Sequence, residues 1–293
     1  HNYDAAIAHL TEAARVGRGH PLVHNALGVA LGQRQTLRHA VEEWPEYRAF
    51  KAALPDDVDV PQVQKLIPRY PSLPLDVQAT VRRALAPFRR FVPAVVRNDA
   101  RHDILTLSES IIHSPVRRWL KDRRTMDKRR YDDVRGVGGK IAATSIEDVE
   151  QAANSSFNTL AHEFAHQVHQ FALSDDQKAK VEALYQAAVK NDLCLDYYAA
   201  HNEFEYFAQG YEAYVSFYKR PGSSLTGRHC RFELQAKDPA LFVFIDSIAD
   251  RSVLEGADWD AALAAATACL RRSSQTDDAA RAMEWNVQRL ARR

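Results

Sequence analysis

The sequence predicts an α+β fold that is rich in helices and contains one small sheet. Two short β-prone runs are the strand candidates, HDILTL at 102–107 and KIAAT at 140–144. Apolar residues recur at helical spacing near the start of the chain, and from residue 156 onward the pattern is almost wholly helical. These two observations together favour a helix-rich domain around a few strands.

The composition is that of an ordinary globular protein, with 46% hydrophobic and 26% charged residues in a chain of 293. The formal net charge of +1 gives no electrostatic reason to expect nucleic acid or an anionic membrane as the main partner. No apolar run approaches the roughly 18 residues that a membrane-spanning helix needs. Composition therefore excludes a membrane span and argues against nucleic-acid binding.

The cysteines and the first residue give information on the cellular compartment of the protein. Cys194, Cys230 and Cys269 are odd in number and far apart, without the CxxC spacing of a metal site. Free thiols in a reducing compartment are the simplest interpretation, so we expect a cytoplasmic protein. No signal-peptide pattern opens the chain, and a first residue of His1 rather than Met is typical of a fragment of a longer polypeptide.

Three amphipathic helices are predicted at the start of the chain, over 3–15, 21–33 and 36–50. Short helices joined by tight turns indicate a helical repeat. NYDAAIAHLTEAA and HPLVHNALGVALG resemble the second helix of one tetratricopeptide repeat and the first helix of the next. The resemblance implies that residues 1–53 form a repeat-like segment that binds a protein partner, and an unrelated helical bundle is the alternative.

A proline-rich stretch follows, with five prolines between residues 54 and 76. Such a density breaks regular structure, so we expect 54–76 to be a linker that leads into a larger domain over 77–293.

Between the two strand candidates lies a strongly basic stretch. Residues 117–135 hold nine Lys/Arg and four Asp, which is typical of a solvated loop, with nucleic-acid contact as the alternative. Gly136, Gly138 and Gly139 then mark a turn or bulge before 140–144, which we expect to be an edge strand.

The stretch at 158–169 carries a chemical motif, because it contains HExxH as His162-Glu163-Phe-Ala-His166. Histidines at i and i+4 lie one above the other on a helix, so both imidazoles can reach one ion. An apolar stripe covers the opposite face of this predicted helix. Zinc suits imidazole ligands, and Glu163 is placed to take a proton from a water that the metal acidifies. The pattern predicts a catalytic zinc site, with two surface histidines as the alternative.

His169 lies one turn beyond His166. Three consecutive turns of one helix reach a single ion poorly, so His169 is a weak candidate for the third ligand. The metzincin pattern is excluded, because its glycine position holds His169 and its last histidine position holds Ala172.

The third ligand is expected from a second helix after Asn202, a plausible N-cap. Its predicted core stripe includes Phe204, and Glu203, Glu205 and Glu212 flank this stripe. Helical periodicity alone does not choose among the three glutamates.

HEFAHQVH followed by Tyr198-x6-Glu205-Tyr-Phe-Ala resembles the gluzincin peptidases of the Mlc titration factor A and anthrax lethal factor type. The resemblance implies a zincin-type catalytic domain with Glu205 as third zinc ligand. It also implies that Tyr198 donates a hydrogen bond to the oxyanion and that the strand after Gly136 borders the cleft.

This sequence departs from those families at two positions. They carry Asp where His169 stands, and lethal factor carries Glu where Gln209 stands. A carboxylate that orients a ligand histidine would then be missing, or supplied by Glu212.

These observations predict a zinc peptidase, either an endopeptidase or an aminopeptidase, in which Glu163 activates the water. Two alternatives stay open. The first is a helical-repeat interaction protein whose degenerate peptidase domain binds zinc without cleaving. The second is a zinc hydrolase that acts on a non-peptide amide.

Overall fold

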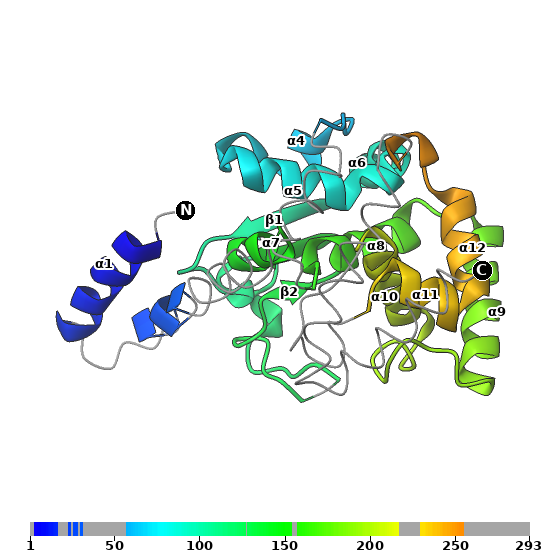
Figure 1. Ribbon diagram of the computed structural model, residues 1–293. Coiled ribbons are helices and arrows are strands. Elements are labelled where there is room, and N and C mark those ends of the chain that lie inside the picture. The colour runs from blue at the N-terminus through cyan, green and yellow to red at the C-terminus, as the bar shows by residue number, and fades with distance from the viewer. Residues whose placement is uncertain are drawn as a thin grey trace, which may run out of the picture.

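The computed structural model describes residues 3–16, 23–24, 26–28, 30–31, 57–126, 128–153, 157–216 and 229–254 (Figure 1). Its named helices and strands, in chain order and apart from five short 3₁₀ helices, are α1 Tyr3–Val16, α4 Val63–Leu66, α5 Leu75–Leu85, α6 Val92–Arg97, β1 Arg101–Leu105, β2 Gly136–Val137, β3 Ile141–Ser145, α7 Ile146–Ala153, α8 Thr159–Phe171, α9 Asp175–Lys190, α10 Glu203–Val215, α11 Arg231–Lys237 and α12 Pro239–Ile248. The predicted helix-rich α+β fold with a small sheet is confirmed.

The sheet has three strands in the order β1-β3-β2. β1 and β3 pair in parallel, from Arg101 opposite Ile141 to Leu105 opposite Ser145, and β2 pairs with β3 in antiparallel orientation. The prediction of an edge strand at 140–144 was therefore wrong. That run forms β3, the central strand, because β1 covers its other side. Within the described residues, β2 at Gly136–Val137 is one edge of the sheet and β1 is the other.

α8 and α10 form the centre of the helical part, and they pack against each other more extensively than any other pair of described elements (Figure 1). α8 also contacts β3 and β2, so one helix touches both the sheet and the helical layer. Its side chains Leu160, Phe164 and Val168 are fully buried, as their spacing of four residues predicts.

Aromatic side chains join α10 to the preceding helices. Phe88 stacks on Tyr211 with ring centroids 4.0 Å apart and lies 5.9 Å from Phe207. On another side of α10, Gly210 lets α12 approach closely, because a Cβ there would lie 2.5 Å from Leu241 Cδ2. α10 is therefore held on several sides, which fixes the position of its first turn.

The proline-rich stretch is more ordered than its composition indicates. α4, a 3₁₀ turn at Tyr70–Ser72 and the start of α5 lie within its described part, 57–76. Leu66, Ile67 and Leu73 belong to the main hydrophobic core. This segment wraps onto the larger domain, and the division of the chain into domains stays a prediction.

The structure tests the predictions for the N-terminal helices and the cysteines only in part. α1 confirms the first predicted helix. Seven of the thirteen residues in 21–33 are described and are helical, whereas the other six and all of 36–50 lie outside the described residues. The tetratricopeptide-like assignment stays a prediction. Cys194 and Cys230 are buried and Cys269 lies outside the described residues, so a reducing compartment stays a prediction.

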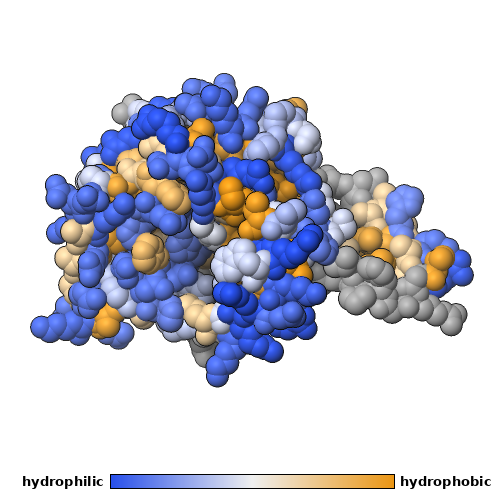
Figure 2. Space-filling view, turned by 180° about the vertical axis from the view of Figure 1, so that it is seen from behind, coloured by the Kyte–Doolittle hydropathy of each residue, from blue (hydrophilic) through white to orange (hydrophobic). Residues whose placement is uncertain are grey.

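The surface agrees with the balanced composition. The face seen in Figure 2 is mainly hydrophilic, with hydrophobic residues gathered in limited areas near its middle. None of the described helices combines the length and apolar character that a bilayer crossing requires.

Candidate metal centre and catalytic cleft

α8 begins at a cap that the sequence provides. The Asn158 side chain accepts a hydrogen bond from the Ala161 N–H at 3.0 Å, and the Asn158 N–H donates to Glu212 Oε1 at 2.8 Å. These bonds fix the first turn of α8 and tie it to α10. One turn further on, His162 and His166 lie on the same face, with ring centroids 4.8 Å apart.

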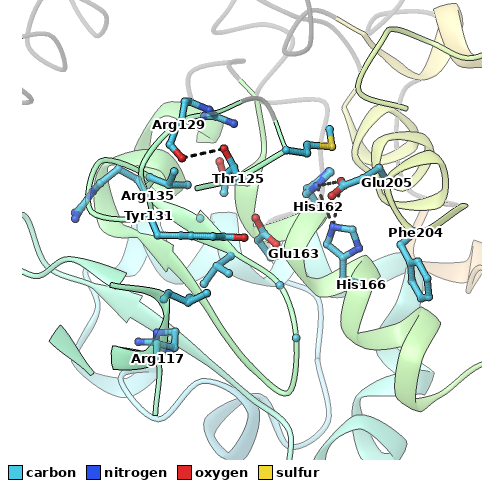
Figure 3. A pocket seen from close by; sticks show the side chains of 18 of the residues that line it. Arg117, Thr125, Arg129, Tyr131, Arg135, His162, Glu163, His166, Phe204 and Glu205 are labelled. Carbon is cyan, nitrogen blue, oxygen red and sulfur yellow. Dashed lines mark hydrogen bonds and ion pairs between the residues drawn. The ribbon is translucent and has the colours of Figure 1, made fainter. Parts of the chain in front are cut away.

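Glu205 reaches the same point from α10. The Asn202 side chain caps this helix by accepting from the Glu205 N–H at 2.8 Å, so Glu205 lies in the first turn. Its Oε2 is 3.1 Å from His162 Nε2 and 3.4 Å from His166 Nε2, and the two nitrogens are 3.2 Å apart (Figure 3). Two helices thus bring three potential ligand atoms together, and Glu203 is not part of the group.

The three atoms fit a zinc ion. With bonds of about 2.0–2.1 Å, ligand atoms of a tetrahedral zinc site lie roughly 3.3–3.4 Å apart, close to the observed separations. Glu205 Oε2 is buried with the two imidazole nitrogens as its polar neighbours, and a buried carboxylate is costly unless a positive charge compensates it. No other group of three His, Cys, Asp or Glu side chains converges in this way in the described part of the chain.

The pKa shifts of Glu205 and His162 also favour a positive charge at this point. Burial would raise the pKa of the Glu205 carboxyl, but its contacts with His162 and His166 outweigh burial and lower it. Burial would lower the pKa of His162, and Glu205 raises it instead, to about 9. Burial lowers the pKa of His166. The buried carboxylate of Glu205 therefore favours a positive charge at this point of the cleft.

Glu163 lies beside the three atoms and faces β2 (Figure 3). Its side chain is buried, and burial raises its pKa to about 8. The β2 segment comes close to this carboxylate, because a Cβ on Gly136 would lie 2.9 Å from Glu163 Oε1. A Cβ on Gly138 would lie 3.1 Å from Oε2 and 2.9 Å from His166 Cδ2. Two of the three glycines predicted to mark a turn, Gly136 and Gly138, are thus required by close approach to the site, whereas Gly139 has a positive φ of 101° and no atom near its missing Cβ.

Tyr198 also lines the cleft, with its ring centroid 6.1 Å from that of His162. It belongs to the segment between α9 and α10. The structure therefore brings all five sequence-predicted site residues to one cleft: Glu163, Tyr198, His162, His166 and Glu205.

The cleft has a volume of about 1190 Å³. One wall is the basic stretch 117–135, which we expected to be a solvated loop. Trp119, Met126 and Tyr131 of this stretch line the cleft, and the Tyr131 hydroxyl points toward Glu163 (Figure 3). No sequence pattern singled out these side chains, because they follow neither helical nor strand periodicity.

Three further expectations need correction or refinement. Phe204, placed in the core stripe of α10, is 44% exposed and lines the cleft. His169 is not a ligand, because it is buried and packs on Phe204 and Phe207, with burial lowering its pKa to about 4. His162 Nδ1 has no hydrogen-bond partner among the described residues, which favours the alternative that the carboxylate orienting this ring is missing over the alternative that Glu212 supplies it. Glu212 instead holds the start of α8.

Comparison with known proteins gives three findings. The PRO-PRO endopeptidase PPEP-2 from Paenibacillus alvei has a similar structure, with 19% sequence identity, a TM-score of 0.46, and coverage of 64% of this chain and 98% of that chain. No curated protein sequence matches the chain significantly. A family model described as "Anthrax toxin lethal factor, N- and C-terminal domain" matches residues 99–248, which are 150 of the 293 residues and include the whole site. The chain therefore belongs to this anthrax toxin lethal factor family.

Proposed function

We propose that the protein is a zinc-dependent peptidase that hydrolyses peptide bonds, with His162, His166 and Glu205 as its metal ligands. The observation that carries the proposal is the triangle of ligand atoms, with sides of 3.1, 3.2 and 3.4 Å, beside the carboxylate of Glu163 in an open cleft. Three protein ligands leave one position of a tetrahedral ion for water or substrate, as catalytic zinc sites require.

When bound, zinc supplies Lewis-acid polarisation of a carbonyl oxygen and acidifies a water molecule. Glu163 Oε2 accepts the proton of the attacking water and passes it to the leaving amine. Burial raises the pKa of the Glu163 carboxyl. A cation held by the three ligands would favour its ionised form, which is the form that accepts the proton of the water. The glycine backbone at 136 and 138 leaves room for this carboxylate and shields it from bulk solvent.

The substrate is an extended peptide lying along β2. The edge strand Gly136–Val137 borders the cleft, and an extended chain can add to such an edge through main-chain hydrogen bonds. The volume of about 1190 Å³ exceeds that of most small-molecule pockets and favours a peptide of several residues. This assignment favours an endopeptidase over an aminopeptidase and over a hydrolase of small amides.

The function is tested with a random peptide library and the full chain. We expect cleavage that disappears after chelation and returns when about one zinc per chain is restored, because three ligands hold a single ion. Binding of zinc without cleavage would contradict the proposal and favour a degenerate binding domain. Cleavage that persists in metal-free protein would also contradict it.

Tyr198 is proposed as the donor to the oxyanion that forms at the scissile carbonyl. Replacing Tyr198 with Phe removes only the hydroxyl, so we expect kcat to fall by roughly 10²–10³-fold with unchanged zinc affinity. Steady-state kinetics on a library-derived peptide measures this change. A rise in KM with unchanged kcat would instead assign the phenol to substrate binding.

We further propose that residues 1–53 bind a protein partner or recruit the substrate and contribute no catalytic group. The helix α1 at Tyr3–Val16 supports a helical segment there, and helical repeats typically provide binding surfaces. A cytoplasmic location likewise stays a proposal.

A further inference from the structure

We propose that Asp196 and His229 are positioning residues that hold Tyr198 against the metal centre through a buried charged network. Four side chains form this network: Asp196, Gln209, His229 and Glu233. The inference rests on the proposed function, because it gives the network the task of placing the phenol of Tyr198.

The segment that carries Tyr198 has no helix or strand of its own to fix it. It runs between the end of α9 at Lys190 and the start of α10 at Glu203. Asp196 Oδ1 accepts hydrogen bonds from the backbone N–H groups of Tyr198 at 2.9 Å and Ala199 at 2.8 Å. Such a side-chain turn sets the backbone at Tyr198, and therefore the direction in which its ring leaves the chain.

The second oxygen of Asp196 ties this turn to the ligand helix. Asp196 Oδ2 accepts from Gln209 Nε2 at 2.9 Å, and Gln209 lies one turn after Glu205 on α10. This hydrogen bond links the segment that carries the phenol to the helix that carries the ligand carboxylate. This contact gives a role to Gln209, where lethal factor carries a glutamate.

His229 lies between two carboxylates. Its Nε2 is 3.2 Å from Asp196 Oδ2 and its Nδ1 is 3.0 Å from Glu233 Oε2, and the side chains of Asp196, His229 and Glu233 are 6%, 5% and 12% exposed. A buried carboxylate is costly unless a cation compensates it, and His229 is placed to compensate both. Burial alone would lower the pKa of His229, but the two carboxylates raise it to about 9, in agreement with a charged ring.

A second contact from α11 supports the same segment. Lys237 Nζ donates to the Leu195 backbone oxygen at 3.1 Å, immediately before Asp196. The segment is thus held at its start by the end of α11, and at Asp196 by His229, just before that helix. None of these groups is a metal ligand, so the network can be altered without removing one.

The test uses the full chain with Asp196→Ala and His229→Gln, each also combined with Tyr198→Phe. As single substitutions, Asp196→Ala should lower kcat by about 100-fold and His229→Gln by about 10-fold. The zinc affinity of each should stay within about threefold of wild type. In the Tyr198→Phe background each should cost less than about threefold, because the phenol that it positions is already absent. His113→Gln, an exposed histidine outside the cleft, is the matched control and should change nothing.

Amide hydrogen exchange gives a readout that does not depend on activity. The Tyr198 and Ala199 amides should exchange at least tenfold faster in Asp196→Ala, because they lose their acceptor. Equal losses of kcat with and without the Tyr198 hydroxyl, or unchanged exchange, would overturn the proposal. If Asp196→Ala does not fold, His229→Gln and its double variant carry the test. A wild-type-like Tyr198→Phe would overturn this inference while leaving the peptidase assignment intact, whereas a failed library test would remove both.

Discussion

Glu163→Gln abolishes peptide cleavage and leaves the zinc content at about one per chain. The amide has nearly the same shape as the carboxylate but cannot accept the proton of the attacking water. Glu163 is not in the ligand group, so its charge is not needed to hold the ion. We expect kcat to fall at least 10³-fold, measured on a library-derived peptide, with metal content determined by elemental analysis.

A matched variant makes this result specific. Glu182 is an exposed glutamate on α9, and Glu182→Gln makes the same chemical change far from the cleft. It should keep wild-type kcat and zinc content. Retention of more than a few percent of activity by Glu163→Gln would contradict its role as base, and loss of zinc would place it among the ligands.

Glu205→Ala weakens zinc binding by several orders of magnitude. It removes one of only three protein ligands and leaves His162 and His166, which can hold the ion through α8 alone. Zinc affinity is measured by competition with a chromophoric chelator. Glu203→Ala is the matched control, because Glu203 lies in the same first turn of α10 outside the ligand group, and its zinc affinity should match wild type.

Glu212→Ala distinguishes a residue that binds the metal from one that only stabilises the helices around it. Glu212 accepts hydrogen bonds from the Asn158 N–H and the Ser216 hydroxyl, so its loss leaves two partly buried donors without this acceptor. We expect a destabilisation of about 1–3 kcal/mol and a smaller loss of zinc affinity than for Glu205→Ala. If Glu205→Ala binds zinc like wild type while Glu212→Ala or Glu203→Ala does not, the assignment of the third ligand is wrong.

The parts of the fold that follow from local rules were predictable. The sequence predicts α8 and α10 because each has apolar residues at helical spacing and an asparagine that can cap its start. In the structure, Asn158 and Asn202 are the N-caps of these two helices. The separation of His162 and His166 follows from helix geometry alone. Periodicity left three glutamates open, and only the family resemblance pointed to Glu205.

The wrong predictions share a physical cause. Whether a residue is buried depends on neighbours from distant parts of the chain, which local sequence patterns do not show. KIAAT was placed at an edge because nothing local shows that Arg101–Leu105, forty positions earlier, covers its other side. Phe204 has the spacing of a core residue, but its part of α10 faces the cleft. The stretch at 117–135 is polar in composition, yet it forms a wall of the site.

The division of the ligands between two helices has a kinetic consequence. His162 and His166 belong to α8, whereas Glu205 belongs to α10, about forty residues later. A fluctuation that separates the first turn of α10 from α8 therefore leaves the ion on two ligands, from which it dissociates faster. The off-rate of zinc will then report how often these two helices part, and substitutions that loosen their packing will shorten metal residence time without altering any ligand.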